Sequence, residues 1–204
     1  MSYTQLISDL EKSLSNEGTG VELVDLQKHA NDFSDAIDNY VKILKDPGNR
    51  IPLLTNKLLI YSQIILITPG TSNLDASASA SALKYATGLN SYISAIQIQG
   101  QGTTVLNLLT PFLNPGTVTT GTLTNSNSIP SIQSDFKTIF NGDIPEDILK
   151  NFTASALIKY KAIQIADLVK KCVINNTTIT ISGNDSTTPP AGPKPFTLTG
   201  KFTE

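Results

Sequence analysis

The stretch Val173-Ile-Asn-Asn-Thr-Thr-Ile-Thr-Ile181 is where the chain changes from a helical to a β pattern. Before it, apolar residues recur at the spacing of amphipathic helices. From Thr177 to Ile181, polar and apolar residues alternate and all are β-branched, which favours a strand. A second alternating run extends from Phe196 to Phe202. The sequence therefore predicts a mainly α protein, a multi-helix bundle with a C-terminal β-hairpin or extended β arm.

This change of pattern predicts two parts, a helical bundle domain over residues 1–174 and a Pro-rich β arm over residues 175–204. Between the two alternating runs, residues 182–195 are rich in Pro, which favours a stiff, extended linker. Two strands alone are only marginally stable in water, so the arm is expected to rest on another surface. That surface is either the bundle of the same chain or a neighbouring chain.

The spacing of apolar residues predicts a series of helices before the arm. Asp46-Pro-Gly-Asn49 ends the second helix, because Pro cannot continue it and Gly tolerates a left-handed turn. The polar, Thr-rich residues 114–129 are predicted to form a long loop or an exposed hairpin around Gly121. The predicted helices span about residues 4–15, 21–45, 52–67, 73–97, 103–113, 130–140 and 145–172.

The charge balance argues against nucleic acid as a partner. Fifteen basic and seventeen acidic residues leave a net charge of −2, and only 16% of the residues are charged. Binding to phosphates needs clustered Lys and Arg. Here Arg50 is the only arginine and Lys170-Lys171 the only adjacent basic pair. The polar surface must come mainly from Ser, Thr, Asn and Gln.

No membrane or secretion signal stands out in the sequence. The N-terminal residues 1–5 lack the basic and apolar regions of a signal peptide. The most apolar run, residues 58–67, is about half the length that a membrane-spanning helix needs. We therefore expect a protein made in the cytoplasm, with no membrane partner.

Few residues are candidates for chemistry. His29, the only histidine, has Asp25 and Asp32 at helical spacing on either side. Such a set could act as a general base or a weak divalent metal site. It is much more typical of a solvated helix edge, which is the interpretation we favour. Cys172, the only cysteine, follows two lysines that could lower its pKa, but a buried structural thiol is the better interpretation.

Motifs of the common enzyme classes are missing. The chain has no G-x-S-x-G nucleophile turn. Gly18-Thr-Gly20 and Gly100-Gln-Gly102 lack the third glycine of a dinucleotide fingerprint, and no G-K-[ST] follows either. The sequence predicts no enzyme of a motif-marked class, no catalytic, cofactor-binding or metal-binding residue, no cofactor and no small-molecule substrate.

In layout, the chain resembles small bacteriophage virion proteins of the neck, tail or baseplate. The residues that carry this resemblance are Asn175-Asn-Thr-Thr-Ile-Thr-Ile181 and the Pro-rich arm to Phe202, joined to a bundle rich in Ile, Asn and Thr. The resemblance is one of composition and organisation, and it implies a structural subunit that is incorporated into a virion.

We therefore expect a non-enzymatic, oligomeric structural subunit whose C-terminal arm contacts neighbouring protein chains, either copies of itself or other proteins. One alternative is a helical protein-binding adaptor that uses the faces of residues 58–67 or 76–95, and another is an enzyme of unrecognised type that uses His29. The arm residues expected at the contact are Ile179, Ile181, Phe196, Leu198 and Phe202.

Overall fold

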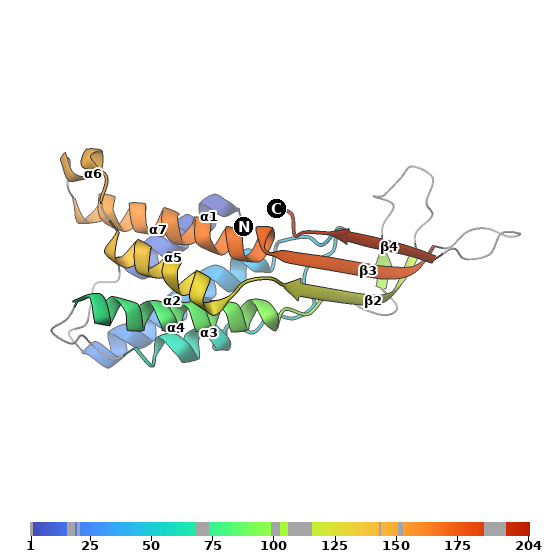
Figure 1. Ribbon diagram of the computed structural model, residues 1–204, viewed down its shortest axis with the longest axis horizontal. Helices are drawn as coiled ribbons and strands as arrows, with labels where there is room; N and C mark the ends of the chain where they lie inside the picture. The colour runs from blue at the N-terminus through green and yellow to red at the C-terminus, as the bar shows by residue number, and fades with distance from the viewer. Residues whose placement is uncertain are drawn as a thin grey trace, which may run out of the picture.

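Helices gather at one end of the molecule and a β-sheet projects from the other, which makes the protein elongated (Figure 1). This arrangement comes from a computed structural model. The predicted fold class, mainly α with a C-terminal hairpin, is confirmed. The structure describes residues 2–15, 19, 21–67, 74–98, 103–105, 116–142, 144–150, 153–185 and 195–204.

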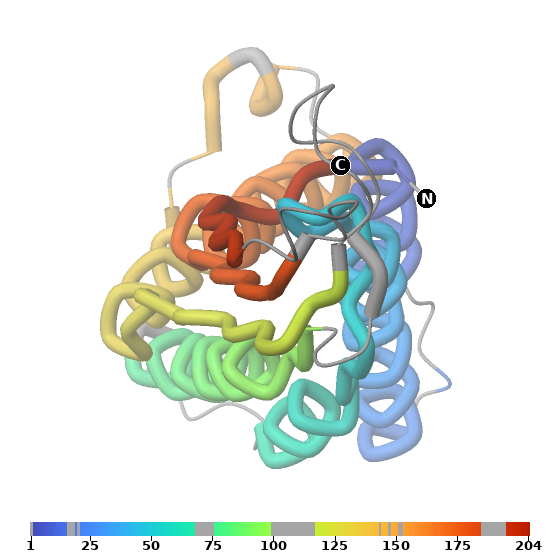
Figure 2. Tube along the Cα trace, turned by 90° about the vertical axis from the view of Figure 1, so that its right-hand side faces the viewer, coloured from blue at the N-terminus to red at the C-terminus, as the bar shows by residue number. Residues whose placement is uncertain are grey.

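Six helices form a ring around one apolar core, and Figure 2 shows this ring end-on. Each helix contacts the next, and the last contacts the first, so that every helix has two neighbours in the ring. A short seventh helix, α6 (Glu146–Lys150), stands off from the ring (Figure 1). The helices of the ring are, in order, α1 (Tyr3–Leu14), α2 (Glu22–Val41), α3 (Leu58–Ile64), α4 (Leu74–Ser94), α5 (Ile129–Asn141) and α7 (Ala154–Lys170).

Local sequence sets both the ends of these helices and their inward faces. Ser128 caps α5, and Thr153 caps α7 by accepting a hydrogen bond from the Ala156 amide at 3.0 Å. On α2, a stripe of residues three and four apart is buried. Complete burial of each large side chain in such a stripe contributes about 1.5–3 kcal/mol. The stripe comprises Ala30, Phe33, Ile37, Tyr40 and Val41.

The projecting sheet is antiparallel throughout, with the strand order β1-β2-β3-β4. β3 and β4 form the hairpin that the C-terminal sequence predicts. β2 also pairs with β3 along its whole length, from Asn125 opposite Thr177 to Gly116 opposite Asp185. The strands are β1 (Thr103–Val105), β2 (Gly116–Asn125), β3 (Thr177–Asp185) and β4 (Pro195–Gly200).

The sheet continues the long axis of the bundle because two helices connect directly to its central strands. α7 passes through one π-helical turn, η1 (Lys171–Asn175), into β3. β2 leads through three residues into α5 (Figure 1). The two connections run in opposite directions, so β2 and β3 meet as an antiparallel pair.

Two predictions upstream of α5 need correction. The predicted loop over residues 114–129 is strand β2 over most of its length, without a hairpin at Gly121. The predicted helix over residues 103–113 begins as strand β1, and its residues 106–113 lie outside the described residues. In both places pairing with another strand decides the structure, and β3, the partner of β2, lies about sixty residues further along the chain.

Two predicted helices are shorter than expected. The predicted helix over residues 52–67 begins only at Leu58. The segment before it is extended and pairs with the end of α4, where the Leu53 amide bonds the Gln97 carbonyl at 2.8 Å. The predicted helix over residues 145–172 is divided into α6 and α7, because Thr153 adopts an extended conformation to cap α7.

A buried ion pair closes the turn after α2. One oxygen of Asp46 accepts the amides of Gly48 and Arg50, and the other accepts two guanidinium N–H groups of Arg50 at 3.0 and 2.8 Å. Asn49 has a φ of 60°, the left-handed conformation that Asn tolerates better than most residues. Pro47 of this turn lies against Gly200, so the turn supports the end of β4.

We expect Asp46→Ala to destabilise the fold by roughly 3–5 kcal/mol, because it leaves the Arg50 guanidinium buried without its counter-charge. Urea unfolding followed by circular dichroism measures this loss. The matched control is Glu146→Ala, which removes a pair exposed on both sides, Glu146–Lys150, and should leave the unfolding midpoint unchanged. Equal effects of the two substitutions would contradict this account.

Candidate functional site

One face of the projecting sheet consists of rows of hydroxyl side chains. Thr122 lies opposite Thr180, which lies opposite Thr199 on the next strand. The neighbouring row is Thr120, Ser182 and Thr197, and the Ser182 and Thr197 hydroxyls are 3.2 Å apart. We call this surface the threonine face. Its members, all exposed or partly exposed, are Thr120, Thr122, Thr124, Thr178, Thr180, Ser182, Thr197 and Thr199.

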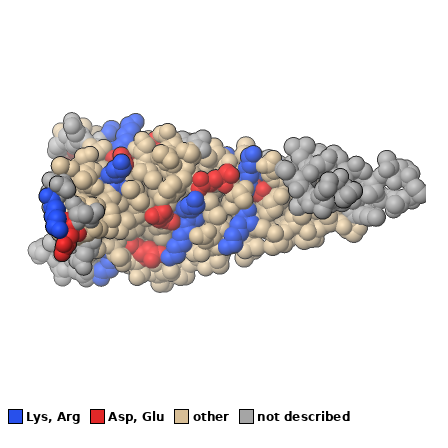
Figure 3. All heavy atoms as spheres, turned by 90° about the horizontal axis from the view of Figure 1, so that it is seen from above, with Lys and Arg blue, Asp and Glu red and all other residues tan. Residues whose placement is uncertain are grey.

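The threonine face carries no charged side chain. In the view of Figure 3 the charged atoms gather over the bundle, and the described part of the sheet in that view is uncharged. The sequence expectation had missed the contribution of β2. The alternation Thr120-Gly-Thr-Leu-Thr124 has the same period of two as the arm and was the available signal.

The opposite face of the sheet is part of the protein core. Val118, Ile179 and Ile181 are completely buried there. Gly183 allows close packing, since a Cβ at this position would lie 2.1 Å from the Thr117 carbonyl oxygen. The β-bulge between Val118 and Thr120 lies beside it. Alternation therefore gives the sheet one core face and one exposed polar face.

The five arm residues expected at a partner contact fall into two groups. Ile179, Ile181 and Phe202 are buried within their own chain, so in this structure they stabilise the chain's own fold. Phe196 and Leu198 lie on the end strand β4 and are only partly covered. Of the five, these two lie where another chain could reach them.

The last residues of the chain are fixed to the bundle, and we call residues 202–204 the C-terminal clasp. Thr203 and Lys45 exchange two backbone hydrogen bonds of 2.8 and 2.9 Å. The Glu204 carboxylate accepts the Tyr40 hydroxyl at 2.7 Å and pairs with Lys170 at 2.9 Å. The hydrogen bond from Lys170 is the main cause that lowers the pKa of Glu204. The arm is thus fixed at both ends, by the pairing of β3 with β2 and by the clasp.

His29 is partly buried and lines a groove beside α1 and α2, and its ring nitrogens are occupied by groups other than the two aspartates. Nδ1 lies 3.1 Å from the Ser13 carbonyl, which can only accept, so Nδ1 carries the proton. Nε2 then accepts the Tyr85 hydroxyl at 2.6 Å. Asp25 instead accepts the Thr19 amide at 2.6 Å, and Asp32 lies 3.7 Å from Lys28. The structure therefore gives His29 a packing role between α1, α2 and α4.

We expect His29 to make stability depend on pH. Burial lowers the pKa of His29 in the folded protein, so below about pH 6.5 the unfolded chain binds a proton that the folded chain does not. Stability should therefore fall, by up to about 1 kcal/mol, between pH 7.5 and 5.5. Urea midpoints across this range measure the slope, and His29→Gln should abolish it. A slope that survives in His29→Gln would assign it to other groups.

Cys172 is a buried thiol. Burial raises its pKa to about 12, although Lys171 lies beside it. The Lys171 ammonium pairs with Asp135 at 2.7 Å. Because only the thiolate is nucleophilic, this cysteine is unreactive at neutral pH.

In the folded protein Cys172 should therefore resist thiol reagents. At pH 8, Ellman's reagent should release no colour from the native chain within minutes, because the thiol is both buried and protonated. In guanidinium chloride it should report one thiol per chain. Rapid labelling of the native protein would show that the thiol is accessible.

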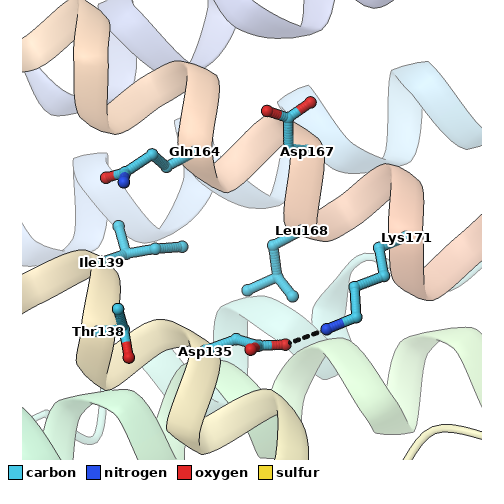
Figure 4. Close-up of a pocket in the computed structure, with 7 residues that line it drawn as sticks. All are labelled: Asp135, Thr138, Ile139, Gln164, Asp167, Leu168 and Lys171. Carbon is cyan, nitrogen blue, oxygen red and sulfur yellow. Dashed lines mark hydrogen bonds and ion pairs between the residues drawn. The ribbon is translucent and has the colours of Figure 1, made fainter.

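A groove of about 320 Å³ lies between α5 and α7 (Figure 4). Lys171 reaches across it to Asp135, and the Asp167 carboxylate accepts the Tyr3 hydroxyl at 2.5 Å. Gln164 contributes a buried side-chain oxygen that has no partner among the described residues. The charged groups of the groove thus have partners within the protein, and their contacts join α1, α5 and α7.

Within the described ranges, no three His, Cys, Asp or Glu side chains come close enough to hold a metal ion. Each of the helices described is too short or too polar to span a lipid bilayer. Comparison of the chain with protein-family models, with curated proteins and with solved structures finds no match. The geometry of the sheet is therefore the main indication of function.

Proposed function

We propose that this chain is a non-enzymatic structural subunit that assembles with neighbouring protein chains through its projecting sheet. The observation that supports this most strongly is the threonine face, an exposed and uncharged surface held beyond the end of a helical bundle. Charged residues are depleted in the centres of protein interfaces, because burial of an unpaired charge is costly. A surface without charges can be covered by a partner at lower cost than the bundle surface.

The attachment of the sheet to the bundle at several points also supports this role. Both central strands connect directly to helices, and the clasp ties the end of the arm to Tyr40 and Lys170. A surface that is already ordered loses little entropy when a partner binds. The contact we propose is therefore the threonine face and the outer edge of β4 beside it. Ile179, Ile181 and Phe202 are buried within the chain and stabilise the position of the sheet. A bacteriophage virion is the assembly to which the sequence resemblance points.

A second candidate function, a protein-binding adaptor, is favoured by one apolar segment. Ile51, Leu53, Leu54 and Leu58 are each more than half exposed, just before and at the start of α3. Exposed apolar patches often mark interaction sites. The helix faces first expected for this role are less suitable, since Ile60 of α3 and Leu89 of α4 are buried in the bundle.

Light scattering over a range of concentrations tests the assembly function on the full chain. We expect an oligomer that dissociates in Thr122→Glu/Thr178→Lys, because this variant places two charges on the threonine face without changing the net charge. Circular dichroism should show an unchanged fold, since both threonines are exposed. The control is Gln27→Glu/Asn31→Lys, which adds the same pair to an exposed stretch of α2 and should leave the oligomer intact.

A wild-type chain that stays monomeric throughout would contradict self-assembly and favour the adaptor. An oligomer that resists the charges on the threonine face but dissociates in Leu53→Ser/Leu54→Ser would move the contact to the apolar segment before α3.

A further inference from the structure

We propose that the outer edge of β4 pairs, antiparallel, with β4 of a second copy of this chain, about a two-fold axis at Leu198. The two projecting sheets would then form one continuous sheet across the dimer. This inference rests on the assembly function proposed above and names its partner and its register.

The free edge of β4 makes such pairing possible. β4 is the last strand in the sheet order, and among the described residues only β3 pairs with it. An end strand presents unpaired N–H and C=O groups, and many proteins prevent pairing at this edge with charges, bulges or proline. In β4 the only feature of this kind is Pro195, at its first position. Among the described residues nothing pairs with the outer edge of the run from Phe196 to Gly200, so a strand could be added there.

The alternation of side chains selects the register. A two-fold axis at Leu198 places Thr197 opposite Thr199 of the second copy, and Leu198 opposite its own equivalent. Threonines then remain on the threonine face, and the apolar side chains remain on the opposite face. A slip by one residue would bring threonine opposite leucine and would break both faces.

The difference in burial between β3 and β4 favours a copy of this chain as the occupant. Ile179 and Ile181 of β3 are completely buried, whereas Phe196 and Leu198 on β4 are only partly covered by their own chain. A second Leu198 beside the first would cover this remaining apolar surface.

Charge is also compatible with self-pairing. The strand itself is uncharged, and the charges nearest to it along the sequence are Lys194 and Lys201, one at either end, of which the structure describes Lys201. The two-fold axis separates the two copies of Lys201 by six residues of extended chain, or about 20 Å. Because this distance exceeds the Debye length at physiological salt, the two ammonium groups do not oppose the pairing.

Disulfide cross-linking of the full chain tests the contact at the axis. Leu198→Cys places two thiols opposite each other across it, so mild oxidation should convert most of the chain into a covalent dimer. The native Cys172 gives no background, since it is buried and its pKa is raised to about 12. The matched control is Asn31→Cys, an exposed position on α2 outside the proposed contact, which should remain monomeric on a non-reducing gel. Equal cross-linking of the two variants would overturn the proposal.

Charge substitutions at two exposed threonines test the register. Thr197→Lys/Thr199→Lys brings lysine opposite lysine twice and should weaken the dimer about tenfold or more in sedimentation equilibrium. Thr197→Lys/Thr199→Glu instead brings lysine opposite glutamate twice and should retain it. If the two variants behave alike, the edge pairing is rejected. If the oligomer persists in both variants but dissociates when charges are placed on the threonine face, the proposed assembly function is retained and the pairing of the β4 edges is rejected.

Discussion

A short set of hydrogen bonds between Asn and Ser residues holds the bundle and the sheet together, and the rest of the structure depends on it. The Ser126 amide donates to the Asn176 carbonyl at 2.9 Å, which joins the start of β3 to the end of β2. The Asn127 side chain donates to the Cys172 carbonyl in the π-helical turn and accepts from Asn176, both at 2.9 Å. These bonds bring the α5 and α7 connections side by side and fix the register of β2 on β3.

That register decides which surfaces the molecule presents. Because Asn125 lies opposite Thr177, the threonines of β2 meet those of β3 on one face, and Val118 joins Ile179 and Ile181 on the other. A displacement by one residue would exchange the two faces. The hydrogen bonds of Ser126, Asn127 and Asn176 therefore help to place the threonines on the outer face and the apolar residues on the inner one. The clasp at Glu204 then prevents the arm from separating from the bundle.

The side chains most able to take part in chemistry are buried or partly buried. His29 is held between the Ser13 carbonyl and the Tyr85 hydroxyl, beside the rings of Phe33 and Tyr85. Cys172 is buried where α7 becomes the π-helical turn. Lys161 caps the end of α5 through the Ile139 carbonyl. Each of these groups satisfies a structural need of the bundle, whereas the exposed end of the molecule carries hydroxyl groups.

The sequence by itself determined most of the helices, the strand character of the arm and the absence of recognisable enzyme motifs. The stripe on α2, the Asp46 turn and the alternation at Thr177 depend on contacts within a few residues, and local spacing records these. Only the tertiary structure decided that residues 116–125 are a strand, that Ile179 and Phe202 are buried and that β4 lies at an edge. These features depend on pairing between segments some sixty residues apart or more, as between β2 and β3 and between Lys45 and Thr203, and no local pattern specifies the partner.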